Sequence, residues 1–177
     1  MNLDASPAFT SRDLRDALGR FATGVAVVTA CDRLGAPVGM TMSSFNAVSL
    51  DPALVLFSVA RTAHSLDAMQ AARGFAVNIL GRAQADLSRH FARAQTDKWQ
   101  TVVHSPGYGD APILAGVLAH FECEPYAQHD GGDHVIFLCR VLRFATSADE
   151  EDPLIFYRGR YHTLAADSER GNHAQDG

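Results

Sequence analysis

The stretch GVLAHFECEPYAQHDGGDHVIFLCRVLRF, residues 116–144, places two long strand-like runs on either side of one turn. The turn HDGGD (129–133) supplies Gly and Asp, which tight hairpins favour because these residues tolerate unusual backbone angles. Both flanking runs are rich in apolar and β-forming residues. We therefore expect a long antiparallel pair here, and with it a fold in which strands dominate.

Further strands and a few helices are expected elsewhere in the chain. Residues 100–115 are expected to form a loop because of their Pro and Gly content. Strands outnumber helices and do not alternate with them, so the pattern favours a mainly β fold, an antiparallel β-barrel with flanking helices packed outside. The predicted strands are 25–30, 38–45, 53–59, 75–80 and a last segment 154–164, and the predicted helices are 10–23, 65–74 and 83–94.

The first predicted helix has an apolar face and a clear start. Leu14, Ala17, Leu18 and Phe21 recur at the spacing of one helical face. Thr10 or Ser11 can cap it, and an acid in its first turn suits the helix dipole.

Length and composition indicate one domain of ordinary globular composition. The chain has 177 residues, which we divide into polar tails at 1–9 and 165–177, expected to be disordered, and one domain at 10–164. The net charge of −5 argues against a nucleic-acid partner, and no apolar run is long enough to span a bilayer. Three cysteines without close spacing, and no signal peptide, favour a cytoplasmic protein.

Several short motifs resemble functional signatures without matching them. GRFATGVA (19–26) has the glycine spacing of a P-loop without its Lys and Ser/Thr, and no dinucleotide-binding fingerprint is present. HDGGDH (129–134) could bind a metal, but a tight hairpin selects Asp and Gly for conformational reasons, so we predict none.

Two segments suggest a binding site. The strand at 53–59 leads through ARTAH to a helix starting near Ser65, where unpaired N–H groups, Arg61 and hydroxyls could hold an anion. Alternatively, Arg61 is a solvated surface residue and Ser65 a simple cap. The stretch VGMTMSSF (38–45) carries hydroxyls in an apolar setting, which either turn the chain or contact a bound molecule.

Taken together, these segments resemble the short-chain flavin reductase family, whose members share an FMN-binding split β-barrel. The resemblance runs from about residue 14 to 164 and rests on the order of several blocks. They are ALGRFATGVAVVT (17–29), GMTMSSFNAVSLDPALVLFSV (39–59), GFAVNIL (74–80), LSRHFA (87–92), GDH (132–134) and YRGRYHTL (157–164).

The resemblance implies a flavin cofactor, FMN or FAD, with NADH or NADPH as the hydride donor. The first strand of the site would follow the flavin ring edge, and the second segment would hold the ribityl and phosphate groups. The cofactor-binding residues implied in these two segments are Met40, Thr41, Met42, Ser43, Ser44, Val59, Ala60, Arg61, Thr62 and Ser65.

Other residues of the resemblance have open alternatives. Ser88 and Arg89 would flank the phosphate, while Phe91 is a candidate there that also suits the core. Asn78 would bond a ring edge or, alternatively, face water from an edge strand.

His134 resembles the nicotinamide-side position and is the single catalytic candidate, expected to tune the reaction; alternatively, it is a strand-start residue tied to the hairpin. The remaining cofactor-binding candidates implied by the resemblance are Tyr157, Arg158, Gly159 and Tyr161. Alternatively, the two tyrosines are half-buried aromatics and Arg158 is an ordinary surface charge.

The function implied is an NAD(P)H:flavin oxidoreductase that supplies reduced flavin to a separate monooxygenase, with a homodimer as the expected assembly. The first alternative is a flavin-binding electron-transfer protein of the same barrel without nicotinamide turnover. The second is a non-catalytic barrel that binds a partner protein or haem. The residues do not distinguish FMN from FAD or NADH from NADPH.

Overall fold

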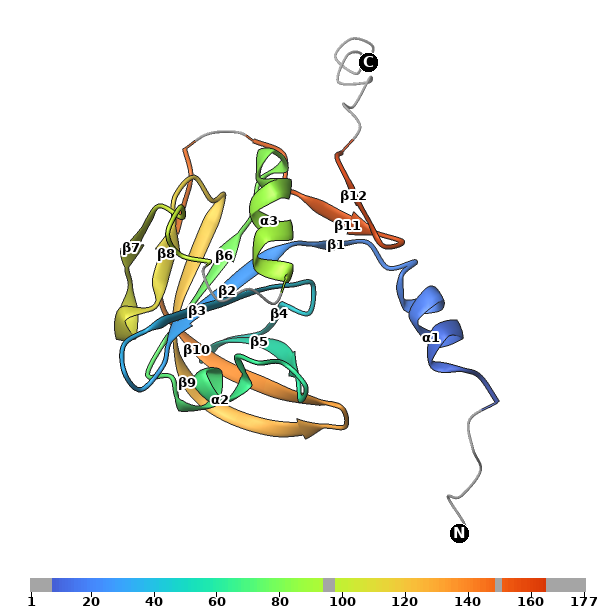
Figure 1. Ribbon diagram of the computed structural model, residues 1–177, viewed down its shortest axis with the longest axis horizontal. Helices are drawn as coiled ribbons and strands as arrows, with labels where there is room; N and C mark the ends of the chain where they lie inside the picture. Colours follow the sequence, from blue (N-terminus) through green and yellow to red (C-terminus); the bar gives the residue numbers. More distant parts are fainter. Residues whose placement is uncertain (1–7, 94–97, 149–150, 165–177) are drawn as a thin grey trace, which may run out of the picture.

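Strands dominate the computed structural model, which describes residues 8–93, 98–148 and 151–164 (Figure 1). The prediction of a mainly β fold is confirmed. The helices are α1 (Ser11–Leu18), α2 (Leu66–Ala71) and α3 (Ala85–Ala92), with 3-10 turns η1 (Arg82–Gln84) and η2 (Tyr108–Asp110). The strands are β1 (Thr23–Gly24), β2 (Ala26–Cys31), β3 (Pro37–Met42), β4 (Asn46–Leu50), β5 (Ala53–Ala60), β6 (Phe75–Ile79), β7 (His104–Pro106), β8 (Pro112–Leu114), β9 (Ala119–Gly131), β10 (His134–Thr146), β11 (Ile155–Tyr157) and β12 (Arg160–His162).

One antiparallel sheet of seven strands, in the order β3-β2-β6-β9-β10-β5-β4, builds the body of the molecule. β9 and β10 are the long hairpin expected from the sequence, and Gly132 adopts a φ of 73° in its turn. Register shifts interrupt the β9–β10 pairing at two places. Such irregularities bend and twist strands, so the sheet curls into the barrel. The edge strands β3 and β4 follow each other in the chain, which brings the two edges of the rolled sheet together at residues 43–45.

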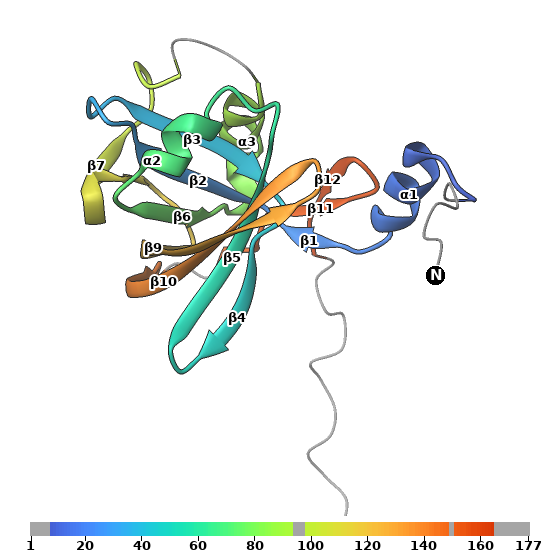
Figure 2. The ribbon, with the colours of Figure 1, turned by 90° about the horizontal axis from the view of Figure 1, so that it is seen from below.

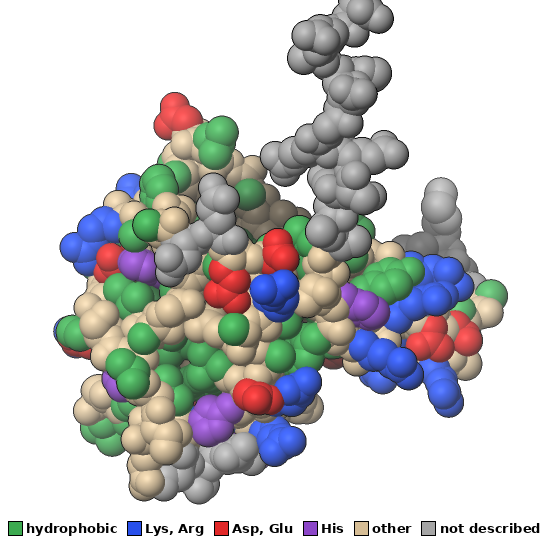
Figure 3. Space-filling view, turned by 90° about the horizontal axis from the view of Figure 1, so that it is seen from above, with side chains coloured by type: hydrophobic (Ala, Val, Ile, Leu, Met, Phe, Trp, Pro, Cys, Tyr) green, Lys and Arg blue, Asp and Glu red, His purple; other side chains and the backbone are tan. Residues whose placement is uncertain are grey.

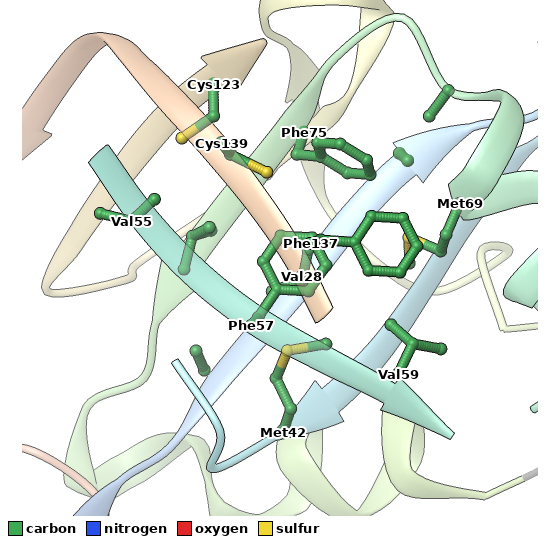
Figure 4. Close-up of a cluster of buried hydrophobic side chains, with 14 of the residues drawn as sticks. Val28, Met42, Val55, Phe57, Val59, Met69, Phe75, Cys123, Phe137 and Cys139 are labelled. Carbon is green, nitrogen blue, oxygen red and sulfur yellow. The ribbon is translucent and has the colours of Figure 1, made fainter. Parts of the chain in front are cut away.

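The core inside the rolled sheet centres on three phenylalanines (Figure 4). The rings of Phe57 and Phe137 stack with centroids 5.2 Å apart, and Phe75 meets both edge-on. Met69 of α2 is fully buried in this cluster. A second cluster around Phe91 lies where α3 packs against β2 and β3.

The prediction of a loop at 100–115 is wrong in part, because this segment contains the short hairpin β7–β8. Long-range contacts stabilise this hairpin. The N–H of Leu114 donates to Asn78 Oδ1 at 2.9 Å, and Thr29 Oγ1 donates to the carbonyl of Pro112. Local Pro and Gly content could not reveal strands that depend on partners so far away in the sequence.

A second unit, which we call the arm, consists of α1 and the three-stranded sheet β1-β11-β12. Figures 1 and 2 show α1 lying away from the barrel. The predicted cap is confirmed: the Thr10 hydroxyl accepts from the Asp13 N–H, and Asp13 accepts from the Thr10 N–H. However, the helix ends at Leu18, and its apolar face is exposed: Leu18 is 64% and Phe21 77% exposed.

Among the described residues, no helix is both long and apolar enough to cross a bilayer. The tails predicted at 1–9 and 165–177 lie almost wholly outside the described residues.

Candidate functional site

A cleft of about 720 Å³ opens along β3, between the end of α3 and the segment that leads into α2. This volume is in the range that binds a cofactor or other small molecule. Apolar groups from β3 and α3 form much of its wall, and two basic side chains, Arg93 and Lys98, also line it. The lining residues are Pro37, Val38, Gly39, Met40, Thr62, Ala63, His64, Ser65, Phe91, Ala92, Arg93, Lys98 and Trp99.

The narrow approach of α3 to β3 depends on Gly39. A side-chain Cβ at this position would lie 2.9 Å from the ring of Phe91 and 3.2 Å from Trp99. Phe91 and Trp99 pack edge to face with centroids 5.1 Å apart. Glycine therefore lets two aromatic rings lie directly against the strand and shape one wall of the cleft.

Four of the residues predicted to bind the cofactor line this cleft: Met40, Thr62, Ser65 and Phe91. Met40 and Ser65 lie next to each other in its wall, where the Ser65 hydroxyl donates to the Met40 sulfur at 3.7 Å. Ser65 is the N-cap of α2, but its hydroxyl makes no capping bond. Phe91 also belongs to the core, being 1% exposed, so both of its predicted roles meet at this wall.

The hydroxyls of VGMTMSSF (38–45) mostly have partners within the protein. Thr41 Oγ1 donates to the carbonyl of Ser88 at 2.6 Å, which ties β3 to α3. The Ser44 hydroxyl accepts from the N–H of Ser58 at 3.0 Å, which closes the corner between the sheet edges. Met42 is buried in the core and Ser43 is exposed. Of the two explanations offered for these hydroxyls, bonds within the protein account for Thr41 and Ser44 without a bound molecule.

Arg61 does not line the cleft, nor do Val59 and Ala60. Its guanidinium donates to the carbonyl of Gly132 at 2.8 Å and to the carboxylate of Asp130 at 2.7 Å. The bond from Arg61, helped by one from the Gly132 N–H, holds the pKa of Asp130 below its ordinary value. Both partners are exposed, so the pair contributes little stability, but it directs the guanidinium toward the β9–β10 hairpin.

The predicted site residues of α3 and the last hairpin meet each other outside the cleft. The hydroxyls of Ser88 and Tyr161 lie 2.7 Å apart, and the Arg89 guanidinium lies 5.2 Å from the Tyr161 ring centroid. The turn beyond is conformationally specific: Arg158 and Gly159 have φ of 49° and 75°. Two positive φ angles in succession are typical of a two-residue hairpin turn, which explains both residues structurally.

Tyr157 stands beside this turn, and none of these residues lines the cleft. Its ring meets His162 edge to face at 5.8 Å, and the Arg158 guanidinium lies 5.7 Å from its centroid.

Asn78 is fully buried, so the interpretation that it faces water from an edge strand is wrong, and it does not line the cleft. Its Nδ2 donates to the carbonyl of Val27 at 3.1 Å, while its Oδ1 accepts from Leu114. β6 is an interior strand between β2 and β9. Asn78 thus joins the sheet to the β7–β8 hairpin and offers no polar atom to a ligand.

His134 is the first residue of β10 and pairs with Ala60 of β5. Ala60 lies two residues before Thr62, which lines the cleft, but His134 itself does not line it. Its Nδ1 lies 2.7 Å from the carboxylate of Asp133, and this bond lowers the pKa of Asp133. An ionised carboxylate only accepts hydrogen bonds, so Nδ1 carries a proton. The bond leaves Nε2 available to a ligand.

Several lining residues are not among the predicted cofactor-binding residues, most notably His64, Arg93, Lys98 and Trp99. One signal was present: Lys98 is the only lysine in the chain. The position of Lys98 and Trp99 depends on how the chain returns to β3 after α3, which no local pattern specifies.

Comparison with known proteins shows that the chain is similar to members of one protein family. The family model described as "Flavin reductase like domain" matches residues 18–165. The chain is 43% identical over 153 residues to FMN reductase (NADH) SmoA of Agrobacterium fabrum, covering 85% of this chain and 84% of that protein.

Two further comparisons agree with this family. The structure of the NADH:FAD oxidoreductase SgcE6 of Streptomyces globisporus, in complex with NAD and FAD fragments, superposes with a TM-score of 0.84 at 36% identity, covering 93% of this chain and all of that one. The reductase component of the flavin-dependent trigonelline monooxygenase of Acinetobacter baylyi is 45% identical over 157 residues, which are 89% of this chain. This chain spans only 50% of the length of that relative.

The structural neighbours are flavin reductases, and the rolled antiparallel sheet with outer helices confirms the predicted split-barrel fold. The cleft along β3 lies within the matched residues. On these grounds the chain belongs to the flavin reductase-like domain family.

Proposed function

We propose that this protein is an NAD(P)H:flavin oxidoreductase that supplies reduced flavin to a separate monooxygenase. The observation that carries the proposal is the cleft along β3, whose lining combines apolar groups with basic side chains inside a flavin reductase-like domain. A flavin has the same division, an apolar ring system and an anionic phosphate end. The names of the relatives support both the reaction and the partner.

The residues of the cleft fit this ligand by chemistry. Val38, Met40 and Trp99 offer apolar surface for the ring, and Thr62 and Ser65 offer hydroxyls. When bound, flavin supplies the acceptor for a hydride from the nicotinamide. The protein's own contribution is to bind and orient the two molecules and to exclude water, so no side chain is required as an acid or base.

His134 is proposed to position the nicotinamide. Its protonated Nδ1 is held by Asp133, so Nε2 is free to bond the carboxamide of a nicotinamide bound over the flavin. We expect His134→Ala to raise the KM for the nicotinamide and lower the rate without abolishing it. Loss of all hydride transfer with unchanged nicotinamide binding would contradict this role.

One assay tests the main proposal. The protein is mixed with FMN or FAD and then with NADH or NADPH under air, and the nicotinamide absorbance is followed. Steady consumption supports the reductase, and the four combinations rank the preferred flavin and nicotinamide. Flavin binding without consumption favours the electron-transfer alternative, and no flavin binding rejects both.

A homodimer is the proposed assembly, with the arm as its contact. The exposed apolar side chains of α1 need a cover, because an eight-residue helix is marginal alone. The arm is also basic: Figure 3 shows basic side chains gathered over it, and the rest of the chain is correspondingly acidic. A second copy therefore offers charge complementary to the arm. The five arginines of the arm are Arg12, Arg15, Arg20, Arg158 and Arg160.

Sedimentation tests the dimer. Leu18→Glu places a charge on the exposed face of α1 and is expected to convert dimer to monomer. Leu34→Glu, at a 94% exposed position in the β2–β3 turn, is the matched control and should leave the dimer intact. A monomeric wild-type protein would reject the assembly.

The proposed location is the cytoplasm. Cys31, Cys123 and Cys139 are all free thiols, as expected in a reducing compartment. Burial raises the pKa of Cys123 to about 12, so this thiol is inert.

A further inference from the structure

One arginine binds the tip of the β9–β10 hairpin to the chain segment that enters the cleft wall. The backbone N–H of Arg61 donates to the carbonyl of Asp133 at 2.9 Å. Its Nε donates to the carbonyl of Gly132 at 2.8 Å, and its Nη2 donates to the carboxylate of Asp130 at 2.7 Å. Arg61 therefore bonds three residues of one turn, and it directly precedes Thr62, which lines the cleft.

The two sides of this connection are held very differently by the rest of the barrel. On the cleft side, Ala63 and Leu66 pack against the barrel core. On the hairpin side, residues 128–133 are all exposed, and the bond from Gln70 of α2 to Gln128 is long at 3.4 Å. The position of the hairpin tip therefore depends on Arg61, whereas the cleft wall is anchored independently.

The same turn carries His134. Its Nδ1 bonds the carboxylate of Asp133, which is the residue whose carbonyl accepts from the Arg61 N–H. Asp130 completes the turn, because its carboxylate also accepts from the N–H of Gly132 at 3.1 Å, where φ is 73°. A continuous chain of bonds thus runs from Asp130 through Arg61 and Asp133 to the imidazole.

Stability alone gives little reason for the pair of Arg61 and Asp130. Their side chains are 47% and 80% exposed, and exposed ion pairs contribute little to the free energy of unfolding. A planar guanidinium that bonds two acceptors at once does, however, fix direction as well as distance. The pair therefore provides position, since it holds the exposed hairpin tip in one place relative to the cleft wall.

We propose that Asp130 and Arg61 are positioning residues that set the place of His134 relative to the cleft, and with it the place of the nicotinamide relative to the flavin. This inference rests on the proposed reductase function and on the proposed role of His134. Neither Asp130 nor Arg61 lines the cleft, so both act through the hairpin turn. Hydride transfer depends on the distance and angle between two rings, so a small displacement of the turn lowers its rate.

Two variants and a control separate the ion pair from the turn and from charge as such. Asp130→Asn keeps an oxygen that can accept from the Gly132 N–H but removes the negative charge that Arg61 binds. Arg61→Lys keeps the positive charge but loses the planar fork that bonds Gly132 and Asp130 together. The matched control is Glu124→Gln, which breaks an ion pair with Arg140 that joins β9 to β10 and not to the cleft segment.

Rapid mixing without oxygen measures the positioning directly. Protein with bound oxidised FMN is mixed with NADH or NADPH, whichever it consumes faster. In Asp130→Asn and in Arg61→Lys we expect the rate constant of flavin reduction to fall about tenfold, because the two rings are misaligned. The long-wavelength charge-transfer absorbance of stacked nicotinamide and flavin should weaken as well. FMN affinity and the denaturant midpoint should stay at their wild-type values, and Glu124→Gln should change none of these quantities.

A double variant tests the route through His134. Asp130→Asn should cause no further loss of rate in protein that already carries His134→Ala, because the side chain that it positions is gone. A full additional loss would overturn the proposal, and so would wild-type reduction kinetics in both Asp130→Asn and Arg61→Lys.

The remaining outcomes distinguish this inference from the proposed function. If both single variants lose FMN affinity or unfold at lower denaturant while Glu124→Gln does not, the pair serves the fold and the positioning role is rejected, although the reductase function stands. If the wild-type protein neither binds flavin nor consumes a nicotinamide, the proposed function is rejected and this inference with it.

Discussion

The barrel and the arm carry similar apolar patterns but bury them very differently. Phe57, Phe75 and Phe137 are at most 1% exposed at the centre of the barrel, whereas no residue of α1 is buried. Periodicity identifies which face of an element is apolar, but it does not say what covers that face. In the barrel the cover is the same chain, and in the arm we propose that it is a second copy.

The two regions should therefore unfold with different free energies. The barrel combines a close-packed aromatic core with a continuous seven-stranded ladder, so its parts should unfold together. The arm is fastened at few points, among them the bond between Tyr161 and Ser88. Elements held by few buried contacts open locally at low cost.

The largest expected effect comes from the centre of the barrel. Phe137→Ala removes a ring that stacks on Phe57 and should lower the free energy of unfolding by about 4 kcal/mol, through lost burial and a new cavity. Phe144→Ala, on the same strand at a 67% exposed position, is the matched control and should have a small effect. Denaturant unfolding measures both, and equal losses would refute the assigned core.

A smaller loss is expected when the buried polar link of the barrel is cut. Asn78→Ala leaves the N–H of Leu114 without its partner and should cost about 2–3 kcal/mol. Gln70→Ala removes an exposed amide and serves as the control. Hydrogen exchange should show that Asn78→Ala loosens the β7–β8 hairpin; unchanged protection there would contradict the structural role of Asn78.

The strands of the barrel could be predicted from the sequence because β-branched runs, turn residues and the long hairpin all agree locally. The candidate site was predicted less well, because its wall is assembled from distant segments. Met40 and Ser65 were found, but Lys98 was not, since only the packing of α3 on β3 brings it there. Asn78 was misinterpreted because a polar residue in a strand looks the same whether it faces a ligand, water or the core.

A smaller loss of stability is expected when the bond between Tyr161 of the arm and Ser88 of the barrel is removed. Tyr161→Phe keeps the ring beside Arg89 but removes the hydroxyl that bonds Ser88, whose side chain is buried. We expect the β11–β12 hairpin to lose about 1 kcal/mol of protection in hydrogen exchange. Tyr126→Phe, at a 55% exposed position, controls for loss of a hydroxyl as such. Equal changes in the two variants would mean that this bond does not hold the arm.

The smallest loss of stability is expected in α1, at the far end of the arm. It tests most directly whether the arm unfolds independently of the barrel. Thr10→Ala removes the hydroxyl that caps α1 and should destabilise this helix by about 1 kcal/mol, so its amides should exchange about fivefold faster. Ser11→Ala, one residue further on, removes a hydroxyl without this capping bond and should not. The free energy of unfolding of the barrel should stay the same in both variants, because no buried side chain joins α1 to it. A matching loss in the barrel would show that the arm is part of the same cooperative unit.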